Sequence, residues 1–447
     1  MAARARKNER GAALLLVIVA VAVVTVLAAD LAYDTQVSLR IAGNARDELR
    51  ALYLAKSGVA LQRLVLSFQQ DLDDAIPKGL PGQLSPPRIQ IWQLVPVGSA
   101  LAATFFQEQA PGPVAPAGQE RAPAGASAGP PPGGFEAVAG DEGRKVNLQL
   151  DSAFTGGLLA AQVQALWQLI CDPRWDALFD QEDENGQRYS RQELIMNLRD
   201  WVDEDSLGSA LAASVPTTCV MITPLNPFEQ GFTDENFPYD RGEDRYRAKN
   251  ARMDSLGEMY LVAGVTDAFM AAFGDGLTVY LPRDEKRNVN TTDRAGLLEL
   301  ARIVADPPGQ PVLYDPEFPD RLQKVVLERT LGGVLSISPQ DFGQILIALG
   351  VKLNMNNLSD TSPKNPFTDR SRVFQIRATA RSGDVTKVVE AVVKFDKLQP
   401  GQVATTPAQR GQPARQGGQA AAAPQQLPAL TGQGATALGQ LVHWRED

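Results

Sequence analysis

The sequence predicts an α+β protein in which one long N-terminal helix packs on a small antiparallel sheet and a large, mostly helical block is inserted between the strands. Three observations predict this fold. An apolar N-terminal run continues into a stretch with helical periodicity, strand-like segments lie on both sides of a helical region at 153–350, and a hairpin pattern follows that region. With 447 residues, of which 44% are hydrophobic, the chain can bury more than one core.

The N-terminal helix is the first predicted element. The run from Ala12 to Ala29 carries no charge and follows four basic residues. As a helix it would be roughly 27 Å long, close to the hydrocarbon thickness of a bilayer, and the preceding positive charge predicts a cytoplasmic N-terminus. From Asp30 to about Asp71 there is no proline, and apolar residues recur at helical spacing. We therefore expect one helix over about 12–72, with 12–29 in the membrane.

Three interpretations of this start differ in where the chain is cut. A secretory signal would be cut near Leu27 to Ala29, and a plain anchor would stay whole. A leader of the prepilin type would be cut earlier, between Gly11 and Ala12, which makes residues 1–11 the leader. The long helix after the apolar run favours the third interpretation, because a cleaved signal peptide needs no such continuation.

Strand and helix patterns divide the rest of the chain. We expect 30–152 to hold the remaining helix and the first strands, 153–350 the helical insertion, and 351–398 the last strands. Segments rich in Pro, Gly, Ala and Gln predict a disordered loop at 110–134 and a disordered tail at 399–447. The predicted strands are 88–94, 135–138, 144–150, 372–380 and 386–393, the last two joined by a turn at Gly383-Asp384, and the predicted helices are 158–170, 191–202, 255–274, 292–305 and 339–349.

Seven short motifs stand in order along the chain. They are RGAALL at 10–15, YLAKSGVA at 53–60, DEGRKVNL at 141–148, LRDWVDEDS at 198–206, GEDRYRAKN at 242–250, DSLGEMYLVAGV at 254–265 and NVNT at 288–291. By these motifs the chain resembles, from about residue 10 to 397, the K family of minor pseudopilins of type II secretion systems. The resemblance implies a pseudopilin fold that carries a SAM-like helical insertion.

The resemblance also implies a role and a location. It implies a non-enzymatic tip subunit that initiates or caps the pseudopilus during export of folded proteins across the outer membrane. Its partners would be the minor pseudopilins I and J, the major pseudopilin and the prepilin peptidase, and it would cross the bacterial inner membrane once, with its bulk in the periplasm. Most pilins carry a glutamate at the fifth residue after the cleaved glycine. Here that position is Leu16, as in the K family, which suits a subunit with no neighbour above it.

The chemistry of the side chains points away from catalysis. The single histidine, His443, lies in the predicted tail, so the sequence predicts neither a histidine-based catalytic triad nor a zinc site. Two cysteines, Cys171 and Cys219, lie on either side of Trp201. An oxidising periplasm would permit a disulfide between them, and two buried thiols are the alternative.

Clusters of carboxylates are the candidate ligand sites. In an exported compartment such dense oxygen ligands suit Ca²⁺, although the spacing is not that of an EF-hand, and solvated surface is the alternative interpretation. The resemblance implies a calcium site near the Asp203-x-Asp205 and Glu243-Asp244 motifs. The clusters are Asp200, Asp203, Glu204 and Asp205, then Glu243 and Asp244, then Asp180, Glu182, Asp183 and Glu184.

A membrane-anchored DNA-binding receptor of a competence-type pilus system is the alternative function. Leu256 to Phe273 resembles a helix-hairpin-helix, whose turn amides bind phosphate. However, the second glycine of the usual turn is missing, and the net charge of −9 and pI of about 5.0 would repel nucleic acid. We therefore interpret this segment as a structural part of the helical insertion. Asn288 to Thr291 is interpreted as a turn and helix cap, with Thr291 or Thr292 as the N-cap.

Overall fold

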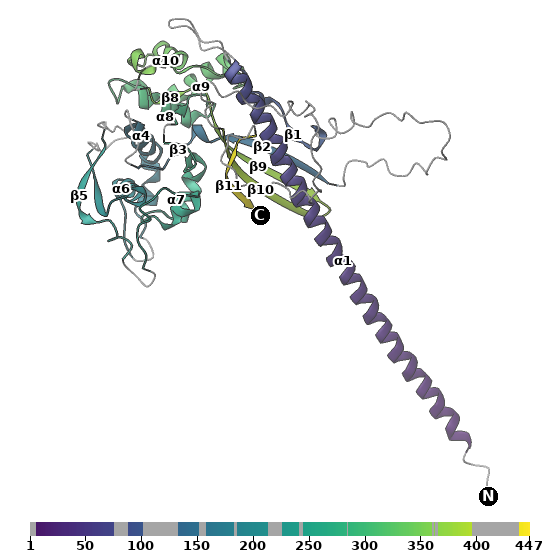
Figure 1. The fold of residues 1–447 in the computed structure, drawn as a ribbon. Helices are drawn as coiled ribbons and strands as arrows, with labels where there is room; N and C mark the ends of the chain where they lie inside the picture. The colour runs from purple at the N-terminus through teal and green to yellow at the C-terminus, as the bar shows by residue number, and fades with distance from the viewer. Residues whose placement is uncertain are drawn as a thin grey trace, which may run out of the picture.

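The long N-terminal helix α1 dominates the shape of the molecule (Figure 1). The computed structural model describes residues 6–75, 88–101, 133–151, 158–182, 186–212, 226–240, 245–283, 285–359, 362, 365–395 and 438–447. α1 spans Arg6–Ala75, a few residues more at each end than the sequence predicts. Its N-terminal half projects away from the remaining fold, and α1 is long and apolar enough to cross a membrane.

One antiparallel sheet packs on the C-terminal half of α1. Its order is β1 (Val97–Gly98), β2 (Gly134–Asp141), β9 (Val373–Ser382), β10 (Val385–Lys394) and β11 (Gln440–Glu446). Gly58 allows the helix to approach the sheet closely, because a Cβ at this position would lie 2.9 Å from the ring of Phe135 and 3.3 Å from Ala378. The core between helix and sheet contains Ala55, Val59, Leu66, Ala137, Ile376, Ala378, Val389 and Ala391. This arrangement confirms the predicted α+β fold.

The last strands confirm one prediction and correct another. β9 and β10 form the predicted hairpin, in which Ser382 pairs with Val385 across a turn where Gly383 has a φ of +57°. We expected residues 399–447 to be disordered, but 440–446 form β11 and pair antiparallel with β10. The strand was not predicted because it is short and follows a long stretch rich in Gln and Ala, whose composition indicates disorder. The unpaired edge of β10 stabilises it with main-chain hydrogen bonds that need no local signal.

The segment before β1 also differs from the prediction. Residues 88–94 were expected to form a strand, but Ile89 makes a single bridge to Leu335, and Ile91–Leu94 forms the one-turn helix α2. The side chain of Gln69 on α1 accepts a hydrogen bond from the Ile91 N–H at 2.6 Å. This N–H therefore cannot donate to a neighbouring strand. The expected strand at 144–150 is reduced to β3 (Val146–Asn147), which follows η1 (Glu142–Arg144).

Among the described residues of 158–368 most regular elements are helices, and they pack around two cores. Around α4 and α6 the core includes Leu166, Leu198 and Phe269, and around α8, α9 and α10 it includes Leu322 and Phe342. The elements are α4 (Leu158–Ile170), η2 (Pro173–Trp175), α5 (Asp176–Phe179), α6 (Arg191–Val202), β4 (Leu207–Leu211), β5 (Phe228–Asp234), η3 (Leu256–Leu261), α7 (Asp267–Phe273), η4 (Gly274–Gly276), β6 (Leu277–Thr278), β7 (Arg287–Asn288), α8 (Arg294–Val304), η5 (Pro311–Tyr314), α9 (Phe318–Arg329), α10 (Pro339–Ala348), η6 (Met355–Leu358) and β8 (Phe367–Thr368).

These elements match the predicted helices with one exception. The expected helix 255–274 is divided into η3 and α7, because the chain turns at Gly264, which has a φ of +92°, and restarts at the N-cap Thr266. Pairs β3–β6 and β7–β8 are parallel and β4–β5 is antiparallel. In Figure 1 the region that contains these helices lies beside the end of α1 that is remote from the N-terminus.

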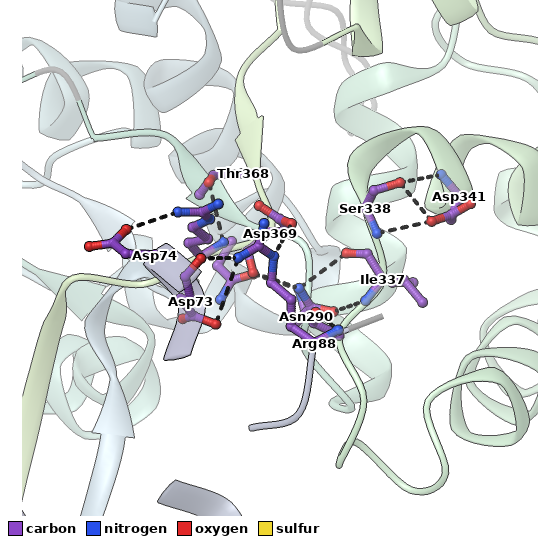
Figure 2. Close-up of polar contacts among 12 residues, drawn as sticks. Asp73, Asp74, Arg88, Asn290, Ile337, Ser338, Asp341, Thr368 and Asp369 are labelled. Carbon is purple, nitrogen blue, oxygen red and sulfur yellow. Dashed lines mark hydrogen bonds and ion pairs between the residues drawn. The ribbon is translucent and has the colours of Figure 1, made fainter. Parts of the chain in front are cut away.

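A polar cluster joins this region to the end of α1 (Figure 2). We call Asp73, Asp74, Arg88, Asp369 and Arg370 the junction cluster. Arg88 is buried, donates from Nη1 to the main-chain oxygen of Asp73 at 2.6 Å, and places Nε 3.3 Å from Asp369 Oδ2. Arg370 Nη1 lies 3.3 Å from Asp74 Oδ1. Three separate segments of the chain are thereby fixed to one another at the end of the helix.

Two buried asparagines extend the junction. Asn290 exchanges hydrogen bonds with the main chain of Ile337, at 2.7 Å from the Ile337 N–H and 3.2 Å to its carbonyl oxygen. Asn288 donates to Asp141 Oδ2 at 2.8 Å. The expected turn and cap at 288–291 is therefore a buried polar connection. The N-cap of α8 is Asp293, not Thr291 or Thr292, since the Asp293 side chain accepts the Gly296 N–H.

Candidate metal centre

Three carboxylates converge beside the C-terminus of α6. Asp203 is the C-cap of that helix, Asp205 follows two residues later, and Glu235 follows β5. One carboxylate oxygen from each residue lies within 4.8 Å of the other two. Asp203 is 3% exposed and Glu235 is 2% exposed, whereas Asp205 faces solvent. The cluster is therefore a pocket that opens on one side.

Several oxygens in this pocket lack a hydrogen-bond donor. Among the described residues, Asp203 Oδ1, Glu235 Oε2 and Asn250 Oδ1 are buried and accept no hydrogen bond. A buried acceptor without a donor costs about 1–3 kcal/mol, and a proton, a water or a cation at these oxygens would offset that cost. Asn250 has a φ of +50°, and its Nδ2 donates to Glu235 Oε1 and to the main-chain oxygen of Asp205, the latter at 2.7 Å. The asparagine thereby links the two sides of the pocket.

The electrostatics of the pocket indicate an excess of negative charge. Burial raises the pKa of Asp203 to about 7, Arg199 opposes the shift, and the neighbouring carboxylates Asp205, Asp200 and Glu235 raise it further. Burial likewise raises the pKa of Glu235. The Arg199 guanidinium lies 3.1 Å from Asp203 Oδ2 and opposes four carboxylates. A divalent cation would complete the charge balance, and a set of hard oxygen ligands is the kind that Ca²⁺ takes.

The structure describes half of the predicted ligand set. Asp203 and Asp205 lie together, while Glu243 and Asp244 are outside the described residues. Glu235 and Asn250 were not predicted. Asn250 ends one of the motifs quoted above, but Glu235 had no signal except its place in a turn after a strand.

Of the other acidic candidates, Asp200 is buried beside Asp203 and accepts the Ser209 N–H at 2.7 Å, and the rest are exposed or outside the described residues. Asp180 and Glu182 are exposed, and Glu182 pairs with Arg188 at 2.9 Å. Glu204 is also exposed. Asp183 and Glu184 are outside the described residues.

The processing and disulfide residues are described only in part. Gly11 and Ala12 lie within α1, and Leu16 is 70% exposed on the apolar part of the helix. Cys171 is disulfide-bonded at the C-terminus of α4. Cys219 lies outside the described residues, so its pairing with Cys171 stays a prediction.

Comparison with solved structures finds a structural likeness. No protein-family model matches the chain, and no curated protein matches it. The chain is similar to the crystal structure of the GspK-GspI-GspJ complex from the type 2 secretion system of enterotoxigenic Escherichia coli. The sequence identity is 15%, the match covers 80% of this chain and 95% of that chain, and the TM-score is 0.42.

Proposed function

We propose that this chain is a K-type minor pseudopilin of a type II secretion system, a structural component without catalytic activity. The observation that carries the proposal is the continuity of α1. One helix of 70 residues contains the leader junction, the apolar run and the face that packs on the sheet. The ordered motifs along the sequence supply the family assignment, and the observed α+β fold is the one that this assignment requires.

The placement of the helical region supports a position at the tip of the filament. It lies beside the end of α1 remote from the N-terminus, so a subunit anchored by its apolar run would hold it far from the membrane (Figure 1). A subunit stacked above would meet this bulk. Leu16 offers no carboxylate to the N-terminal amine of such a subunit, so the steric and electrostatic reasons agree.

The proposed partners and location follow from the same assignment. A prepilin peptidase would cut between Gly11 and Ala12, leaving α1 in the inner membrane with the sheet and helices in the periplasm. The minor pseudopilins I and J and the major pseudopilin would pack along α1. On its outer face α1 exposes Leu49, Tyr53 and Phe68 at 58%, 66% and 59%. Burying such surface against a neighbouring helix contributes about 25 cal/mol per Å².

We further propose that the pocket at Asp203, Asp205 and Glu235 binds Ca²⁺, with Asn250 as a fourth oxygen donor. Glu243 and Asp244 are the residues that the family resemblance adds to this set. The ion would hold the C-terminus of α6 to the turn after β5, which come from distant parts of the sequence. Its role is structural, because it would order the helical region and not take part in a reaction.

Sequencing the mature N-terminus and mapping cross-links test the assignment directly. Mass spectrometry of the protein extracted from membranes should show a chain that starts at Ala12. A start near Asp30 would contradict the pilin-type leader. Cysteine cross-linking along α1 should join this chain only to pseudopilins that lie below it in the filament. Cross-links between two copies of this chain along the filament would contradict a tip position. A DNA-binding receptor would instead need a basic surface, whereas the described helical region has an acidic pocket.

A further inference from the structure

The C-terminal strand β11 is held on the sheet differently from its neighbours. β2, β9 and β10 bury alternate side chains, whereas six of the seven β11 residues are exposed and only His443 is half-buried. The apolar side chains Leu441, Val442 and Trp444 are 38%, 42% and 37% exposed. The side chains of β11 are therefore only partly covered, and none of them is fully buried.

Main-chain contacts also hold β11 on the sheet. Its ladder with β10 runs from the pair Val389 and Glu446 to the pair Lys394 and Gln440. Arg63 on α1 donates from Nε to the Leu438 carbonyl at 3.0 Å and from Nη2 to the Gly439 carbonyl at 2.8 Å. Because every peptide has these carbonyl and amide groups, such contacts fit an extended segment of almost any sequence.

Two side-chain contacts give the edge a preference. Lys56 on α1 lies 2.8 Å from Glu446, and the ring of Tyr280 in the helical region lies 5.3 Å from the ring of His443. The cation and the ring belong to different parts of the fold, one on each side of the strand. Together they favour a segment with an acid near one end and a ring three residues before it.

β10 keeps its core contacts independently of β11. Val389, Ala391 and Val393 are fully buried in the core beneath α1, and β10 pairs along its whole length with β9. Removing β11 would therefore expose a row of main-chain donors and acceptors but little apolar core. An exposed edge of this kind can pair with another chain.

We propose that the outer edge of β10 is a strand-acceptor site that β11 occupies within this chain and that an extended segment of a partner protein can take in its place. The partner segment would carry an acidic side chain opposite Lys56 and an aromatic or imidazole ring opposite Tyr280. This is β-augmentation, in which main-chain bonds supply affinity and a few side chains supply specificity. Because β11 is covalently tethered, its effective concentration at the edge of β10 is high. A partner segment that binds only weakly therefore cannot displace it.

A cleavable tether tests the proposal in the full chain. A specific protease site would replace residues 411–416, within the long segment before β11, and the probe is a labelled peptide of residues 438–447. In detergent, we expect the cleaved chain to bind the peptide at least about tenfold more tightly than the uncleaved chain, because the tether is lost. Equal binding by both chains, or a fragment that leaves only when the whole chain unfolds, would overturn the proposal.

A charge swap tests the specificity. A peptide with Glu446→Lys should bind the cleaved chain about tenfold more weakly, and Lys56→Glu in the chain should restore its binding. A peptide with Gln440→Ser, changed at an exposed position, is the matched control and should bind as the parent does. If Lys56→Glu fails to restore binding, the acid does not select the segment and the partner chemistry proposed here is wrong.

Discussion

Asp73 in the junction cluster should make the stability of the protein depend on pH. Burial raises the pKa of its carboxyl to about 6, while Arg88, Gln69 and Arg370 oppose the shift. The nearest guanidinium nitrogen, Arg88 Nη1, is 3.9 Å from Asp73 Oδ1, which is too far to offset the loss of water fully. The ionised carboxylate is therefore less favourable in the folded chain than in the unfolded one.

The sign and size of the effect follow from the shift. Because the folded-state pKa lies above the unfolded value near 3.8, the folded chain binds more protons between about pH 4 and 6. The free energy of unfolding should fall as the pH rises through this window and level off above it. A shift of about two units corresponds to roughly 3 kcal/mol, which is an order-of-magnitude value for this buried group.

Asp73→Asn isolates this contribution. The amide keeps an oxygen for Gln69, and Arg88 keeps its bond to the main chain and its contact with Asp369. Denaturant unfolding of the chain from residue 30 onward, at pH 4, 5, 6 and 7, should show wild type losing about 2–3 kcal/mol relative to Asp73→Asn as the pH rises. The difference between the two proteins cancels other groups that titrate in this range, including Asp203.

Asp74→Asn is the matched control one residue along the helix. The Asp74 side chain is 50% exposed and contacts Arg370, so its loss should cost at most about 1 kcal/mol and leave the gain in stability at acid pH intact. Parallel profiles for wild type and Asp73→Asn would refute the reasoning, since they would mean that the Asp73 carboxylate is as favourable in the fold as in water.

Two further predictions concern the ion and the tip. Chelation should lower the melting temperature of wild type, because an ion bound only to the folded chain stabilises it by about 2.7 kcal/mol at a concentration one hundred times its Kd. The double variant Asp203→Asn with Glu235→Gln should show no change in melting temperature on chelation. The control double variant Asp180→Asn with Glu182→Gln should show the same change as wild type. If chelation leaves the melting temperature of wild type unchanged, the proposed ion site is wrong. Leu16→Glu should give no gain in secretion, whereas the same change combined with deletion of 153–350 should allow cross-links between adjacent truncated subunits. If the truncated subunits do not cross-link to one another, then Leu16 and the helical region are not what would exclude this chain from the filament body.

Local sequence patterns were sufficient to predict the elements whose structural signals lie within their own residues. α1, the β9–β10 hairpin and helices such as α4 and α6 have apolar patterns, caps or turn glycines within their own residues. β11 and α2 have no such signal, because the edge of β10 and the side chain of Gln69 determine them from far along the chain. α9, at Phe318–Arg329, was not predicted although its first turn contains a proline at a position that favours helices.

The residues of the candidate site likewise fall into those with a local sequence signal and those without one. Asp203 and Asp205 were predictable because they lie in one motif after a helix, whereas Glu235 and Asn250 reach the pocket through the turn after β5 and a loop near residue 250. Sequence spacing cannot show which carboxylates lose water, yet burial is what leaves Asp203 and Glu235 with unpaired oxygens. The motifs at 141–148 and 288–291 carry equally polar residues, but Asp141 and Asn288 satisfy each other at the junction. Glu142 Oε2 in the first of these motifs is also buried without a donor, but among the described residues only Asp203, Asp205 and Glu235 bring three carboxylates together. The distinction between a ligand site and a structural connection therefore depends on carboxylates that converge, which only the folded arrangement reveals.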